Sequence, residues 1–128
     1  MGEGLHPTPG YHHVTVVEAG RVAYLAGQMP VDESGARVVG AGDPDRQVDQ
    51  TVANILRALA VAGARPEDVV RSVVYVVSDD PGVLGRVWRR LAGSVIGPAF
   101  TSASTLVGVA ALGFPGQLVE VDLTAALG

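Results

Sequence analysis

Two Asp-Pro steps, Asp43-Pro44 and Asp80-Pro81, constrain the fold of this chain more than any other feature. An aspartate accepts hydrogen bonds from the free N–H groups of a first helical turn, and a proline at the first helical position loses no hydrogen bond. After each step, apolar residues recur at three- and four-residue spacing, which predicts two amphipathic helices. The stripes are Val48, Val52, Ile55, Leu56 and Leu59, ending at Gly63, and Leu84, Val87, Trp88 and Leu91. Each helix therefore has one face to pack on a sheet.

Runs rich in β-branched residues predict the strands of that sheet. We expect a hairpin of strands 13–18 and 22–28, a short strand near 38–39, and further strands at 69–77, 104–112 and 118–122. Strands accompanied by only two helices indicate an α+β fold, with one mixed sheet and both helices on one face. Residues 1–128 are expected to form one domain in which residues 1–10 are a flexible arm.

Composition narrows the possible partners. The chain has 128 residues, 48% hydrophobic and 17% charged, with no cysteine, no lysine and a net charge of −4. The absence of lysine excludes Schiff-base chemistry, and the acidic balance argues against a nucleic-acid partner. No apolar run approaches the roughly 20 residues of a membrane span, so we expect no membrane partner. Because the N-terminus has no pattern of a secretion signal and the chain has no cysteine for disulfides, we expect a cytoplasmic location. The apolar surplus predicts contacts between subunits.

The last two predicted strands place Glu120 between Val119 and Val121. Strand alternation puts its side chain on the face opposite theirs. In a cleft, such a carboxylate could transfer a proton or hold a water molecule. An ordinary solvent-facing carboxylate is the alternative interpretation.

Residues 104–112 and 118–122 resemble the C-terminal motif of the RidA/YjgF family of enamine and imine deaminases: Pro-x-Arg-Ser/Thr-x-Val-x-Val-x-x-Leu-Pro, then Val/Ile-Glu-Ile/Val-Glu. Tyr11-His12-His13-Val14 and the segment 25–32 are similar to two further family elements, so the resemblance covers nearly the whole chain. It implies a chorismate-mutase-like subunit and a homotrimer whose sheets form a central barrel. A small-molecule ligand would bind in the clefts between subunits.

The resemblance also implies roles for individual residues. Glu120 would position the attacking water, Tyr11 would border the cleft, and Gly27 would allow a close approach between the backbone and the ligand, although a simple strand bend explains Gly27 equally well. Ser104 stands where the family has the arginine that grips a substrate carboxylate. A hydroxyl cannot replace that bidentate, charged contact, so an anionic imino acid is a poor candidate substrate unless a neighbouring subunit supplies an arginine.

Three other residues complete the candidate site. Thr105 and Phe100 are expected to contact the ligand, with core packing as the alternative for Phe100. His13 is the candidate acid/base partner of Glu120, since imidazole titrates near neutral pH. Strand alternation allows only one of His12 and His13 to enter a given cleft. The three histidines lack a regular metal-ligand spacing, and we expect neither a metal nor a cofactor.

Three functions remain open. The first is an enzyme that hydrolyses or isomerises an imine, enamine or related reactive intermediate bound between subunits. The second is a non-catalytic ligand-binding protein on the same trimeric scaffold. The third is the ribonuclease activity sometimes attributed to the family, against which the net charge of −4 argues.

Overall fold

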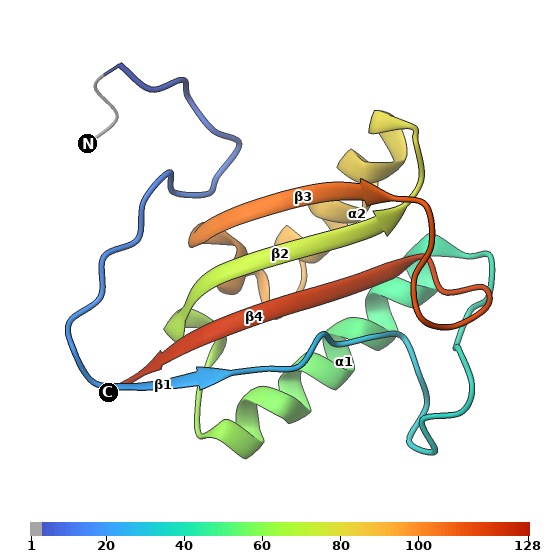
Figure 1. Ribbon diagram of the computed structural model, residues 1–128, viewed down its shortest axis with the longest axis horizontal. Coiled ribbons are helices and arrows are strands. Elements are labelled where there is room, and N and C mark those ends of the chain that lie inside the picture. Colours follow the sequence, from blue (N-terminus) through green and yellow to red (C-terminus); the bar gives the residue numbers. More distant parts are fainter. Residues whose placement is uncertain (1–3) are drawn as a thin grey trace.

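The computed structural model describes residues 4–128 as a four-stranded mixed sheet with both helices on one face (Figure 1). The sheet order is β1-β4-β2-β3; β2 and β3 are parallel, and β4 is antiparallel to both of its neighbours. The expected α+β fold is confirmed. The elements are β1 (Arg21–Tyr24), α1 (Pro44–Ala62), β2 (Val69–Val77), α2 (Pro81–Ala92), β3 (Ala103–Val109) and β4 (Val119–Leu127).

Both helices begin where the Asp-Pro steps predict. Asp43 Oδ1 accepts a hydrogen bond from the Arg46 N–H at 3.2 Å, and Asp80 Oδ1 accepts one from the Gly82 N–H at 2.8 Å. Gly63 ends α1 in the left-handed conformation, with φ of 73°, which glycine adopts without the steric cost of a Cβ. Local capping chemistry is therefore sufficient to set the helix boundaries.

The buried face of α1 differs from the predicted stripe at one edge. Leu56 is exposed, whereas Gln47 and Thr51 are fully buried. Successive helical residues are about 100° apart, so a face centred between Thr51 and Ile55 includes Gln47 and leaves Leu56 at the opposite margin. The prediction missed this rotation because it counted only apolar residues.

Two arginines of α2 hold aspartates of α1 on the outer side of the helical layer. Arg86 binds Asp45 through two hydrogen bonds, of 3.1 and 2.7 Å, and Arg90 binds Asp49 through two, of 2.9 and 2.8 Å. The hydrogen bond from Arg86 holds the pKa of Asp45 below its ordinary value of 3.8, and Arg90 does the same for the pKa of Asp49. These paired contacts fix the two helices side by side.

The predicted N-terminal hairpin is wrong. Residues 13–18 form no strand, and the segment instead passes the start of β3, where the Ala103 N–H donates to Thr15 Oγ1 at 3.0 Å. Val16 is 83% exposed, and among residues 4–128 no strand pairs with the segment 13–18. Strand formation needs a neighbour, and β1 pairs with β4 instead.

Other boundaries also shift. The run 22–28 becomes β1 plus a looser continuation, in which Gln28 and Val121 exchange two hydrogen bonds, of 2.7 and 3.0 Å. The short strand near 38–39 is reduced to one bridge between Val31 and Val38. β3 ends at Val109 rather than residue 112, and β4 continues beyond residue 122 to Leu127. Residues 1–3 of the expected arm lie outside the described residues.

The sheet has one covered and one open face. Side chains directed toward the helices, such as Val74, Val121 and Leu123, are at most 1% exposed and form the core. The alternate residues of β2 and β4 are only partly buried, and Tyr24 of β1 is 82% exposed. Within residues 4–128, both helices lie behind the sheet, and no element covers its front (Figure 1).

Candidate functional site

Glu120 lies near the start of β4 and points to the open face, because its neighbours Val119 and Val121 are fully buried under the helices. Its Oε1 accepts a hydrogen bond of 3.2 Å from Gln117 Nε2. The Gln117 side chain is only 3% exposed and also donates to the Val119 carbonyl at 3.0 Å. Glu120 is therefore held at one oxygen by a buried amide that is itself fixed.

Gly27 faces the second oxygen of the same carboxylate. A Cβ built on Gly27 would overlap Glu120 Oε2 and would lie 2.9 Å from its Cδ. Any larger residue at position 27 would therefore have to displace the carboxylate. In the single chain, the group that closely approaches the Gly27 backbone is Glu120 itself; the approach to a ligand stays a prediction.

The loop that carries Gln117 is tied to the core by Gln47 of α1. Gln47 Nε2 donates to the carbonyls of Gly116 at 2.8 Å and Gly40 at 3.1 Å, and its Oε1 accepts from the Leu118 N–H at 2.7 Å. Because the Gln47 side chain is fully buried, these bonds are shielded from water. One helix residue thus fixes the loop immediately before Glu120.

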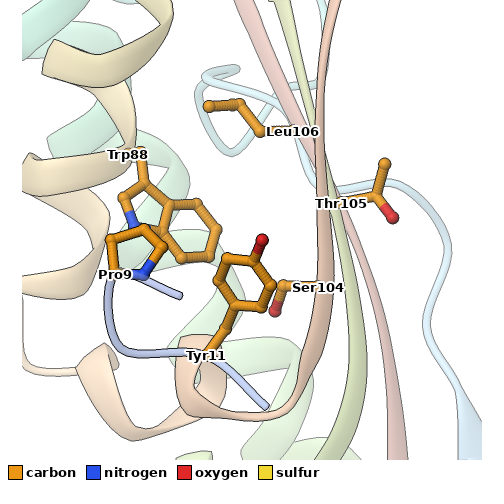
Figure 2. Close-up of a pocket in the computed structure, with 6 residues that line it drawn as sticks. All are labelled: Pro9, Tyr11, Trp88, Ser104, Thr105 and Leu106. Atoms are coloured by element: carbon orange, nitrogen blue, oxygen red, sulfur yellow. The ribbon is translucent and has the colours of Figure 1, made fainter. Parts of the chain in front are cut away.

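A cavity of about 370 Å³ lies on the other side of the sheet, between α2, the start of β3 and the N-terminal segment. Its lining residues are Pro9, Tyr11, Trp88, Ser104, Thr105 and Leu106. Figure 2 shows the Tyr11 and Trp88 rings, Ser104 and Leu106 on one side of β3, with the Thr105 side chain directed to the other. The ring centroids of Tyr11 and Trp88 are 6.0 Å apart at an interplanar angle of 82°, an edge-to-face contact.

Ser104 enters this cavity with its hydroxyl already engaged. It accepts a hydrogen bond of 2.6 Å from the buried Ser72 hydroxyl and donates one of 3.0 Å to the Ser102 carbonyl. A hydroxyl has one donor and two acceptor lone pairs, so Ser104 keeps one acceptor for a ligand. It has no charge with which to attract one.

Thr105 points to the open face and binds an arginine that the sequence interpretation overlooked. Arg71 of β2 donates to Thr105 Oγ1 at 2.9 Å and to the Ala103 carbonyl at 3.3 Å. The ladder between β2 and β3 pairs Arg71 with Ala103 and Val73 with Thr105. Without this register, the sequence shows Arg71 only as a charged residue that interrupts an apolar run, and its contact with Thr105 cannot be predicted.

His13 does not pair with Glu120 within one chain. Its Nε2 is hydrogen-bonded to the His6 carbonyl at 2.6 Å, and its ring stacks edge-on against His6 at 4.6 Å. The adjacent His12 bridges Ala103 at the beginning of β3, whereas Glu120 lies level with Tyr75, which pairs with Val107. From His12, Glu120 is therefore four residues along the strand direction and three strand spacings across, which correspond to about 13 Å and about 14 Å.

Phe100 is 1% exposed and lies in the core, where its ring contacts Trp88 with a centroid separation of 5.6 Å. It therefore supports the tryptophan that lines the cavity and does not line the cavity itself. Core packing, the alternative offered by the sequence, describes its place in the single chain. Trp88 is the aromatic residue that reaches the cavity, and its position in an apolar helix stripe gave no sign of this.

The candidate residues thus form two separate groups. Tyr11 and Ser104 lie on the helix side of the sheet, at the β3 edge. Gly27 and Glu120 lie on the β4–β1 side, where the carboxylate points to the open face. A ligand cannot contact all four within one chain, because β2 and the sheet itself stand between the groups.

Within residues 4–128, no group of three or more His, Cys, Asp or Glu side chains is arranged to hold a metal ion. Over the same part of the chain, no helix has the length and apolar character needed to cross a membrane.

Comparisons with known proteins agree with this fold. A family model described as Endoribonuclease L-PSP matches residues 3–127. Protein DfrA of Myxococcus xanthus is 32% identical over 118 residues, which cover 90% of this chain and 83% of that protein.

Two solved structures are similar to the whole fold. YyfB of Yersinia pestis, a protein of unknown function in the Rid family, is 35% identical with a TM-score of 0.80, over 92% of this chain and 87% of that one. The YjgF gene product of E. coli is 23% identical with a TM-score of 0.66, over 86% and 84% of the two chains, a likeness of fold alone.

Proposed function

This chain belongs to the Endoribonuclease L-PSP family, whose solved relatives include Rid and YjgF proteins, and we propose that it binds a small metabolite in clefts between its own subunits. Glu120 acts there on an imine, an enamine or a related reactive intermediate. The observation that carries the proposal is the division of the candidate residues into two groups on opposite sides of the sheet. Two copies of the chain can bring these groups together, whereas one copy cannot.

The uncovered sheet face supports the same assembly. Partly buried Val73, Tyr75 and Val107 lie on it next to Glu120, and Tyr24 is almost fully exposed. Apolar area of this kind is normally buried against a partner. We propose a cytoplasmic homotrimer in which the three open faces meet in a central barrel.

Glu120 has the contacts of a water-positioning group. Gln117 donates to one oxygen, and the second oxygen lies against Gly27, which has no side chain to displace it. In hydrolysis, this oxygen would accept a proton from water as the water oxygen adds to the C=N carbon. The proton would pass to the imine nitrogen and give a carbinolamine. Glu120 would then carry the hydroxyl proton to the same nitrogen, so that the C=O bond forms as the C–N bond breaks and a carbonyl compound and an amine leave. The same carboxylate could transfer a proton in an isomerisation.

Turnover of imines tests the catalytic proposal. Imines that lack a carboxylate, together with imines generated in situ from neutral and acidic amino acids, would be incubated with the wild-type protein and with Glu120→Gln, and carbonyl product would be followed over time. Asp122→Asn is the matched control, because Asp122 is the next acidic residue on the same strand face. We expect acceleration by wild type and Asp122→Asn only; no acceleration by any of them refutes the catalytic role.

A non-catalytic ligand-binding protein is the second candidate function. It is favoured by Ser104, whose hydroxyl is engaged within the chain and leaves the cavity without a charged anchor. Native mass spectrometry of the purified protein separates the two functions when imine turnover is absent, because a retained small molecule shows binding without catalysis.

The assembly has its own test. Light scattering should give a mass close to three chains, and a stable monomer would refute both the trimer and the shared site. Cell fractionation tests the proposed cytoplasmic location.

A further inference from the structure

The cavity beside Trp88 has an uncharged, partly aromatic lining, as is typical of small-molecule pockets. None of Pro9, Tyr11, Trp88, Ser104, Thr105 and Leu106 carries a formal charge, and two of the six have aromatic rings. Its volume of about 370 Å³ lies at the lower end of the range for small-molecule pockets, about 300 to 1,000 Å³. A single ring with one substituent is of suitable size.

Polar groups in the cavity are few and specific. Among residues 4–128, neither the Tyr11 hydroxyl nor the Trp88 indole N–H has a hydrogen-bond partner, and neither is a buried, unsatisfied atom. Ser104 retains one acceptor lone pair. The Tyr11 hydroxyl, which Figure 2 shows between Trp88 and β3, can therefore donate a hydrogen bond to a neutral carbonyl or amide oxygen, but no side chain in the lining neutralises a carboxylate.

We propose that this cavity binds the uncharged aromatic or apolar part of the ligand, with its ring against Trp88 and a neutral acceptor near the Tyr11 hydroxyl. This inference rests on the proposed binding function and adds the class of ligand. A carboxylate placed there would lose its hydration without gaining a cation, which is a large cost in an apolar site. A neutral ring loses little hydration and gains stacking and dispersion contacts.

Trp88 is the chain's single tryptophan, so its fluorescence reports on this cavity directly. The wild-type protein would be titrated with benzamide and with benzoate, which have nearly the same shape but differ in charge. We expect a saturable change with benzamide and binding of benzoate weaker by about tenfold or more. Equal or tighter binding of benzoate overturns the proposal, and so does the absence of a response to both probes.

Two variants separate charge from size. Ser104→Arg places a guanidinium in the cavity and should reverse the preference toward benzoate, whereas the similarly bulky but neutral Ser104→Gln should keep the preference for benzamide. Circular dichroism confirms that each variant is folded; if either fails to fold, the comparison of the two probes on wild type decides alone. A preference for benzoate that disappears in Arg71→Gln would assign anion binding to Arg71 instead and refute the neutral site.

This outcome is independent of catalysis. Imine turnover that depends on Glu120, together with tight benzoate binding, refutes the ligand class and keeps the proposed function. Selective benzamide binding without turnover keeps the ligand class and refutes the catalytic role.

Discussion

Replacing Gln47 with leucine tests whether one buried amide holds the loop before Glu120. Leucine has a similar volume, so Gln47→Leu removes hydrogen bonds without leaving a large cavity. The lost bonds run to Gly40 at 3.1 Å, Gly116 at 2.8 Å and Leu118 at 2.7 Å, from a side chain that is fully buried. At about 1 kcal/mol for each, the free energy of unfolding should fall by about 3 kcal/mol. The melting temperature should fall by about 10 °C.

Urea unfolding followed by circular dichroism measures this free energy. The chain concentration must be constant, because any association stabilises the folded state by mass action. Gln50→Leu is the matched control on the same helix: its amide donates to the Val31 carbonyl at 3.4 Å and to Asn54 at 3.0 Å, from a less buried site. If Gln47→Leu and Gln50→Leu differ by less than about 1 kcal/mol, the central role of Gln47 is refuted.

Two further predictions concern the close contact between Gly27 and Glu120 and the ion pair between Arg86 and Asp45. Gly27→Ala should lower any rate that depends on Glu120 by about tenfold to a hundredfold, because the new Cβ displaces the carboxylate. The free energy of unfolding should change by less than about 1 kcal/mol, because only the end of a flexible side chain moves. Enzyme kinetics and urea unfolding measure the two effects. A loss of stability large enough to explain the lower rate would contradict the claim that Gly27 acts by leaving room for the Glu120 carboxylate. Arg86 lowers the pKa of Asp45 in the folded state, so this pair contributes stability above the ordinary value of 3.8 and loses it as the pH falls through the folded pKa. The urea midpoints of wild type and Arg86→Gln should therefore differ at pH 7 and converge as the pH falls below 3.8 through the folded pKa of Asp45, and a difference that widens in acid would contradict the assignment.

The sequence predicted what depends on local chemistry. Asp43 and Asp80 cap their helices through atoms two or three residues away, and the β-branched run at 69–77 forms a central strand as expected. The strand predicted at 13–18 does not form, because pairing depends on residues distant in the sequence and no strand within residues 4–128 pairs with this segment. A periodic pattern specifies which face a strand would bury, but not whether a neighbour exists.

The same distinction applies to the site. Strand alternation correctly placed Glu120 opposite Val119 and Val121. Alternation also places Ser104 and Thr105 on opposite faces of their strand, yet both were predicted to contact the ligand. The local sequence does not show how many chains surround a ligand, and so it does not show which of the two faces the ligand contacts. Arg71 becomes visible as a neighbour of Thr105 only once the register of β2 and β3 is known.

The strand order has a consequence for how the chain folds. β4 follows every other strand in sequence but lies inside the sheet, between β1 and β2. During synthesis, β1 and β2 are therefore made well before residues 119–127 emerge. Until then, β2 can pair with at most one neighbouring strand, β3. Long-range closure of this kind slows folding and exposes apolar strand edges while it is incomplete. Stalled or shortened products that lack β4 should be the aggregation-prone species of this protein.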